Sequence, residues 1–238
     1  SSADTILGDD NSCLNMELVY DGLSYSNFTF EVDELAKNYK IILRDTTSLS
    51  TKEYILNLYF YNEEEDVYTK SSSFDATLSA NLRFASNITA KNAGDYSVFA
   101  ENITSTNFDV IFGMANTLSS YVVKILPKEL TYKVSGISKE FDNKNAIIYY
   151  EDASTILDGI ILGDTLSITL TMYDGAAIAR YAGSGYTVQA VLTNGSNYII
   201  SGSLTGEITK AKVGLYIENT EVVYGQQPTF NYEINYGD

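Results

Sequence analysis

Carboxylates are the side chains through which this chain could perform acid–base chemistry, because its 238 residues include no histidine. Without that base, Ser-His-Asp and Cys-His centres are excluded. Two adjacent acidic pairs, Asp33 with Glu34 and Glu151 with Asp152, have the composition of a glycosidase site. Neighbouring residues on a strand point to opposite faces. We therefore expect neither pair to share a cleft, and we predict no catalytic residue and no enzymatic activity.

An acidic run is the candidate for binding a cation. It consists of Glu63, Glu64, Glu65 and Asp66. Calcium is the metal that such oxygen ligands would select, but the run lacks the spaced oxygens and the glycine of a compact calcium loop. Four like charges in a row favour a solvated loop. With one cysteine, Cys13, a structural zinc site is not expected either. We predict no cofactor, with calcium at these four residues as the alternative.

An amide cross-link between lysine and asparagine is a second chemistry that needs no histidine. Links of this kind occur in surface β modules, where a buried acid assists them. Lys128 on an early strand and Asn197 on a late strand of the same segment are the candidate partners.

The composition of the chain excludes several classes of partner. Its formal net charge is −16, which repels the phosphates of nucleic acids and anionic membrane surfaces. No run reaches the roughly 18 apolar residues of a membrane span, so direct membrane insertion is not expected. The hydrophobic share of 45% is that of a globular protein. Its 20 tyrosines, 10 phenylalanines and lack of tryptophan favour half-buried β surfaces.

Alternating apolar and polar residues dominate the chain. The runs are bounded by Asn, Gly, Asp or Ser and recur about every 8–12 residues, a spacing typical of antiparallel sandwiches and barrels. They include residues 39–45, 53–61, 95–101, 108–113, 120–126, 130–136, 146–152 and 165–173.

Helix signals are confined to two short stretches. Residues 32–39 could form a single turn capped by Asp33, and residues 151–159 another turn closed by Gly159. Neither stretch is long enough to organise a domain.

Parts of the sequence repeat. Residues 123–151 align with residues 206–234 at an offset of 83, which places Tyr132 on Leu215. Residues 92–113 align with residues 182–202 at an offset of 90, which places Tyr96 on Tyr186. We infer a first β module at residues 1–126 with an insertion around 33–73, a second at 127–212, and the start of a truncated third at 213–238.

The repeated motifs resemble a known family. The pattern AGSGYTV (182–188), which follows LDGIILGDTLSITLTMYDG (157–175), is similar to the MBG and YDG domains of bacterial surface proteins and adhesins. KEFDN (139–143) stands where the family usually has K-x-Y-D-G, and NAGDYSV (92–98) carries the resemblance into module one. Residues 127–212 match best, and the middle of module one is longer than in the family. The resemblance implies tandem modules that are extracellular and non-enzymatic, and it carries no catalytic residue.

These observations lead to one main expectation about fold and function. We expect an all-β chain of tandem Ig-like antiparallel β-sandwich modules in an elongated arrangement, with β-grasp-like modules as the alternative. Its expected role is a spacer or adhesin segment on a bacterial cell surface.

Two other functions stay open. One is an adhesin tip that binds its ligand through the inserted region 33–73. The other is an acidic calcium-dependent hydrolase. The expected partner is a protein or glycan on a host or neighbouring cell. End-to-end self-association through residues 213–238 is a further expectation.

Overall fold

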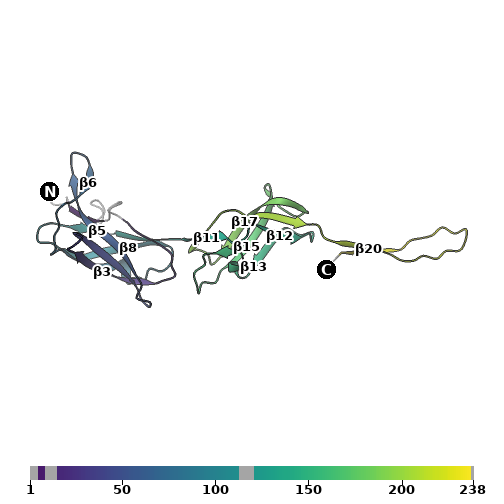
Figure 1. Cartoon of the computed structure of the whole chain (residues 1–238), viewed down its shortest axis with the longest axis horizontal. Coiled ribbons are helices and arrows are strands. Elements are labelled where there is room, and N and C mark those ends of the chain that lie inside the picture. The colour runs from purple at the N-terminus through teal and green to yellow at the C-terminus, as the bar shows by residue number, and fades with distance from the viewer. Residues whose placement is uncertain (1–4, 9–14, 113–120, 237–238) are drawn as a thin grey trace. The chain divides into compact units, whose positions relative to one another are not determined.

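The protein is built almost wholly from β-strands, which confirms the all-β prediction (Figure 1). The computed structural model describes residues 5–8, 15–112 and 121–236; Cys13 lies outside these ranges. Two 3-10 turns, η1 (Ala85–Asn87) and η2 (Ala153–Thr155), are the helical elements of the described residues. No helix in these ranges is long and apolar enough to cross a membrane.

The chain divides into two compact units. The first contains Ser1–Glu129 with Ser196–Ile199, and the second contains Leu130–Gly195 with Ile200–Asp238. The strands of the first unit are β1 (Thr5–Gly8), β2 (Asn15–Val19), β3 (Tyr25–Asp33), β4 (Asn38–Asp45), β5 (Thr51–Asn62), β6 (Val67–Lys70), β7 (Ser79–Phe84), β8 (Gly94–Thr104), β9 (Ile111–Phe112) and β10 (Tyr121–Leu126).

Hydrogen bonds connect the first unit's strands in the order β2-β10-β8-β7-β3-β4-β5-β1-β9, and β6 pairs with β5. The long strand β5 changes partner halfway, because Thr51 to Leu56 pair with β4 and Asn57 to Phe60 pair with β1. The core beneath these strands is rich in aromatic residues. Its largest fully buried side chains include Tyr25, Tyr39, Leu43, Leu56 and Phe84.

The second unit, to which we count β11 and β18 although each begins with two residues of the first unit, contains two larger sheets and a separate hairpin. Their orders are β14-β11-β18, β12-β19-β17-β15-β13 with β16 on β15, and β20-β21. The strands are β11 (Lys128–Tyr132), β12 (Gly136–Glu140), β13 (Ile147–Tyr150), β14 (Leu157–Asp158), β15 (Ser167–Asp174), β16 (Ala177–Ile178), β17 (Gly183–Thr193), β18 (Tyr198–Ser201), β19 (Thr205–Thr209), β20 (Val213–Ile217) and β21 (Tyr232–Tyr236).

Strand β15 shows why the sequence forms these sheets. Ile168, Leu170 and Met172 are fully buried, whereas the threonines between them are half-buried. Successive side chains on a strand point to opposite faces, so this alternation places every second residue in the core. β13 and β17 flank β15 on its two edges.

The two units share one order of strands. In the first it runs β2-β10-β8-β7-β3, and in the second β12-β19-β17-β15-β13. The first pair is parallel in both units and the following pairs are antiparallel. A smaller group also corresponds, β5-β1-β9 in the first unit and β14-β11-β18 in the second. The alignment of residues 92–113 with 182–202 therefore joins β8 to β17, strands at matching places in the two sheets.

Residues 33–73, the expected insertion, supply strands rather than a loop. They contribute β4, β5 and β6, and β4 lies between β3 and β5 inside the sheet. The prediction of a turn capped by Asp33 at 32–39 is confirmed, but the prediction that this turn is helical is wrong. Those residues form a β-hairpin turn in which Lys37 takes a φ of 57° and Asp33 accepts the Ala36 N–H at 2.9 Å.

The turn expected at 151–159 is present as η2. The Asp152 side chain caps it by accepting the Ser154 N–H at 2.8 Å. Gly159 follows with a φ of 97°, a conformation that favours glycine.

Candidate functional site

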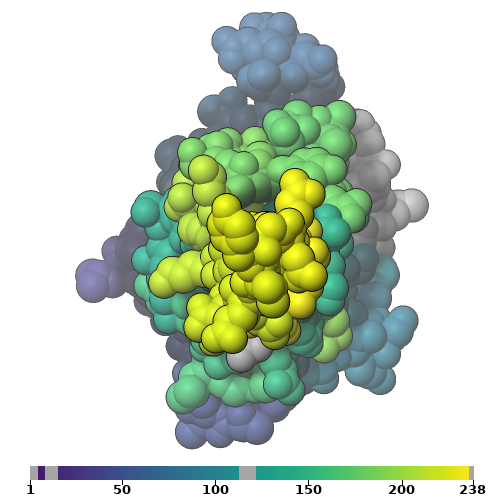
Figure 2. Space-filling view, turned by 90° about the vertical axis from the view of Figure 1, so that its right-hand side faces the viewer, coloured from purple at the N-terminus to yellow at the C-terminus, as the bar shows by residue number. Residues whose placement is uncertain are grey.

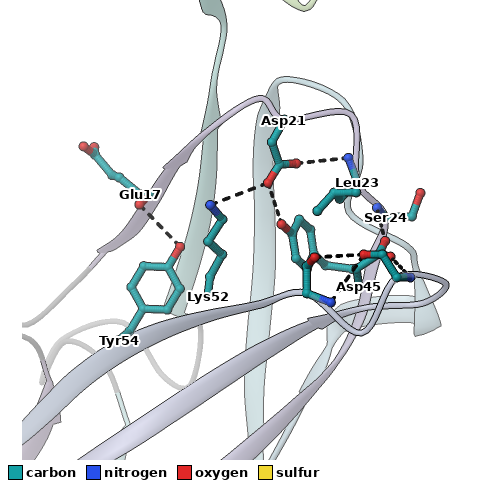
Figure 3. A network of polar contacts seen from close by, with 10 residues as sticks. Glu17, Asp21, Leu23, Ser24, Asp45, Lys52 and Tyr54 are labelled. Atoms are coloured by element: carbon teal, nitrogen blue, oxygen red, sulfur yellow. Dashed lines mark hydrogen bonds and ion pairs between the residues drawn. The ribbon is translucent and has the colours of Figure 1, made fainter. Parts of the chain in front are cut away.

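The sequence VYDG (19–22) in the first unit is similar to EFDN (140–143) in the second, and its aspartate, Asp21, fixes a turn (Figure 3). One Asp21 carboxylate oxygen accepts the Leu23 N–H at 3.0 Å, which closes an Asx turn. The other accepts the Tyr25 hydroxyl at 2.6 Å and lies 3.7 Å from Lys52 Nζ. Gly22, the next residue of the motif, has a φ of 78°. The carboxylate therefore holds the chain where it turns from β2 into β3.

The second unit repeats this turn with Asp142. Its carboxylate accepts the Lys144 N–H at 3.0 Å and pairs with Lys139 Nζ at 2.5 Å. Asn143 replaces the glycine and has a φ of 62°, which asparagine tolerates. The aromatic residue before each aspartate also makes an equivalent backbone hydrogen bond in the two units. Tyr20 N–H donates to Leu126, the last residue of β10, and Phe141 N–H donates to Thr209, the last of β19.

Asp45 and Asp75 are two buried carboxylates that sequence reasoning missed. Asp45 accepts N–H groups from Ser24 at 2.8 Å, from Thr47 at 3.0 Å and from Ser48, and Figure 3 places it beside Asp21. Asp75 accepts the Ser105 hydroxyl at 2.5 Å and the Thr77 hydroxyl at 2.6 Å. The segments DTTS (45–48) and DAT (75–77) have the Asx-turn composition that could have identified them.

The hydrogen bonds of these two aspartates determine their charge state. Donors from Ser48 and Ser24 hold the pKa of Asp45 well below its usual range. The Ser105 and Thr77 hydroxyls do the same for Asp75. Burial raises the pKa of Tyr54, beside this network, to about 12. A general acid or base needs a pKa near the working pH. These groups instead keep fixed charge states, and their arrangement is suited to holding loops.

The predicted carboxylate pairs lie in different surroundings. Asp33 forms an ion pair with Lys40 at 3.1 Å, and Glu34 lies in the exposed hairpin turn. Contrary to our expectation, Glu151 and Asp152 do share a cavity, because the chain leaves β13 at Tyr150 and turns before reaching them. This open cavity has a volume of about 460 Å³, and its lining includes Asp164, Ile161 and Leu162.

Asp152 is poorly suited to act as a general acid in this cavity. The side-chain and backbone hydrogen bonds from Ser154 lower the pKa of Asp152. A glycosidase acid requires a raised pKa instead. We therefore do not assign Asp152 the role of a catalytic acid.

The acidic run Glu63 to Asp66 forms the exposed turn of the β5–β6 hairpin. Asn62 accepts the Glu64 N–H at 3.0 Å, and the Tyr61 hydroxyl donates to Asp66. In the described ranges, no three Asp, Glu, Cys or His side chains are grouped so that they could hold a metal ion. The turn is thus closed by its own residues.

Lys128 and Asn197 are neighbours through their backbones. The Lys128 N–H donates to the Asn197 carbonyl at 2.8 Å. The Asn197 amide is engaged elsewhere, because it donates to Asn92 Oδ1 at 3.0 Å and accepts the Ala93 N–H at 2.8 Å. The carboxylates buried among the described residues are Asp45 and Asp75, neither of which hydrogen-bonds to Asn197 in this network. The cross-link between Lys128 and Asn197 stays an untested prediction, and the hydrogen bonds of the Asn197 amide do not favour it.

Intact-mass spectrometry tests the cross-link. Because both polar atoms of the Asn197 amide are hydrogen-bonded to other partners, we expect the mass calculated from the sequence, without loss of ammonia. Lys128→Arg is the control, since arginine cannot form this link. A mass lower by one ammonia in the native chain and restored in Lys128→Arg would contradict this expectation.

Comparison with known proteins finds no relative. No protein-family model matches the chain, and no curated protein or solved structure is similar to it.

Proposed function

We propose that this chain is a non-enzymatic segment of an extracellular bacterial surface protein, built from tandem Ig-like β-sandwich modules of the MBG and YDG kind. Its role is that of a spacer or adhesin segment. The shared strand order of the two units supports this proposal most directly. The matching Asx turns at Asp21 and Asp142 support it further, since they explain the motif that resembles the family. Its ligand, where it has one, is a protein or glycan on a host or neighbouring cell.

Surface labelling of intact cells tests the location. An antibody against the chain is expected to label intact cells that express its gene as strongly as permeabilised cells. An antibody against a cytoplasmic protein of the same cells is the control, and it should label only after permeabilisation. Labelling by the first antibody that also requires permeabilisation would overturn the surface proposal.

An adhesin tip is the second candidate, and a feature of the first unit favours it. β4, β6 and the first half of β5 have no counterpart in the second unit. The β5–β6 hairpin extends from the body of its unit (Figure 1), and Tyr61 and Tyr68 pack against each other near its turn, with ring centroids 5.3 Å apart. Aromatic side chains with exposed hydroxyls are common in binding surfaces.

An exchange experiment separates spacer from tip. The gene segment for this chain is replaced in frame by unrelated β modules of the same length, and adhesion of the cells is measured. If the chain is a spacer, adhesion should be retained, because a spacer contributes only its length and solubility to the surface protein. Loss of adhesion, together with a similar loss for the Tyr61→Ala and Tyr68→Ala double variant, would favour the tip.

A further inference from the structure

The β20–β21 ribbon, the yellow part of the chain in Figure 2, has an exposed apolar face. Leu215 is paired with Ile234 and Ile217 with Tyr232, and paired residues lie on the same face of a ribbon. Leu215, Ile217, Phe230 and Tyr232 line an open groove of about 490 Å³. The side chains of this apolar face are all exposed and none is charged: Val213, Leu215, Ile217, Phe230, Tyr232 and Ile234.

The ribbon corresponds to the opening strands of each complete unit. Its strands begin at Val213 and Tyr232, 19 residues apart. The interval from β11 to β13 is also 19 residues, and that from β1 to β3 is 20. Together with the sequence alignment of residues 123–151 with 206–234, this spacing makes β20 the equivalent of β11 and β1. We therefore identify the ribbon with the first and third strands of a β unit.

The strands equivalent to β20 in the two complete units, β1 and β11, have neighbouring strands on both edges. β1 lies between β5 and β9, and β11 lies between β14 and β18. Leu130 on β11 is 0% exposed, whereas Val213 on β20, which the alignment places on it, is 53% exposed. Neither complete unit pairs its first strand with its third, yet β20 pairs with β21 within the described residues. The apolar face of the ribbon is thus one that the repeat normally buries under later strands.

The later strands of the second unit show which segment fits. β18 pairs with β11, and β19 pairs with β12. These two strands lie in residues 196–212, whose charged side chains are Glu207, Lys210 and Lys212. The ribbon has only acidic charges, Glu218, Glu221 and Glu233. A closing segment with basic residues complements this charge, whereas a second copy of the ribbon would add like charge.

We propose that the apolar face and the free edge of β20 bind a β segment of the same repeat, with the residue pattern of residues 196–212. Binding adds a strand to β20 by backbone hydrogen bonds and buries Leu215, Ile217 and Tyr232 under its apolar side chains. This proposal rests on the proposed repeat architecture and deepens it by naming the partner of the β20–β21 ribbon.

A peptide titration tests the proposal. A fluorescein-labelled peptide of residues 196–212 is titrated with the full chain, and its fluorescence anisotropy is recorded. Because the contact is small, we expect a dissociation constant on the order of 100 µM. A scrambled peptide should not bind. Amide chemical shifts in the NMR spectrum of the unmodified chain should change in residues 213–217.

Matched variants locate the binding face. Leu215→Glu places a charge on the apolar face and should weaken binding at least tenfold. Tyr216→Glu places the same charge on the opposite face of the same strand and should leave it within about twofold. Equal losses in both variants, or shift changes confined to other strands, would overturn the proposal.

Two other results would also overturn it. One is the absence of any peptide-dependent anisotropy or shift change. The other is concentration-dependent dimerisation that Leu215→Glu abolishes, without peptide binding, which would make a second copy the occupant. Both are distinct from a failure of the proposed function, because surface labelling of intact cells does not depend on the ribbon.

Discussion

Leu170→Ala is expected to lower the free energy of unfolding of the second unit by about 2–5 kcal/mol. Leu170 is 0% exposed on β15 and faces the core between Ile168 and Met172, which are also fully buried. Removing its side chain loses apolar burial and leaves a cavity that the flanking strands β13 and β17 can fill only partly. The first unit has its own core, so its stability should not change.

Hydrogen exchange followed by mass spectrometry in increasing urea measures both units in one sample. In Leu170→Ala, protection should be lost at lower urea in residues 136–209 and at unchanged urea in residues 15–112. Val191→Ala is the matched control, because Val191 lies opposite the outward-facing Thr169 and is 65% exposed. Its cost should stay within about 0.5 kcal/mol. Equal losses for both variants, or a parallel loss in the first unit, would show that the described core does not stabilise the second unit independently.

Asp75→Ala is expected to have the second largest effect, in the first unit. Asp75 is 3% exposed and accepts hydrogen bonds from Ser105, Thr77 and the Thr106 N–H. Alanine would leave these donors without an acceptor, which costs more than the loss of the bonds alone. We expect the Tm of the first unit to fall by more than about 5 °C. Asp109→Ala, at an exposed position of the following loop, is the control and should melt within about 2 °C of the native chain.

The pH dependence of stability provides a second readout for Asp75. Its folded-state pKa lies below the value of about 3.9 for an unfolded aspartate, so the unfolded state binds protons first as the pH falls. The stabilisation is therefore complete above about pH 5 and is lost as the pH falls through 4 toward the folded pKa. Asp75→Asn cannot titrate, so its urea midpoint should decline less than that of the native chain between pH 5 and pH 2.5. An identical decline would assign the acid sensitivity to other carboxylates.

Strand positions were the most predictable part of the fold. The alternation in residues 165–173 places the strand within two residues of β15, because a period of two is a local property of the sequence. The repeat at offset 90 likewise aligns residues of β8 with residues of β17. The first inference depends only on residues close together in the chain, and the second only on a comparison of two segments of the sequence.

Pairing between distant strands could not be predicted. Nothing in residues 15–19 indicates that they lie parallel to residues 122–126, since that choice depends on the whole sheet. The same limit explains the segment 33–73. Its alternating strands were recognised, but whether they extend the sheet or form a separate loop is set by pairing with β3.

The burial and the surroundings of charged side chains were the hardest features to predict from the sequence. Asp75 is buried and Asp66 is exposed, although both precede a short strand or turn in a polar segment. Their difference comes from Ser105 and Thr106, which are distant in sequence and bring donors to Asp75 only in the folded unit. Glu151 and Asp152 share a cavity for a related reason, because the strand on which we expected them ends one residue earlier.

The parallel pairs β2–β10 and β12–β19 have a consequence for a chain under tension. In each pair, one strand is near the beginning of its unit and the other near the end. A pull on Asn15 and Leu126 draws the two strands in opposite directions along their common axis. All hydrogen bonds between them are then sheared together and must break nearly at once. The antiparallel ribbon β20–β21, pulled at Val213 and Tyr236, would instead unzip one bond after another. Each unit thus carries its own clamp against stretching, and the ribbon carries none.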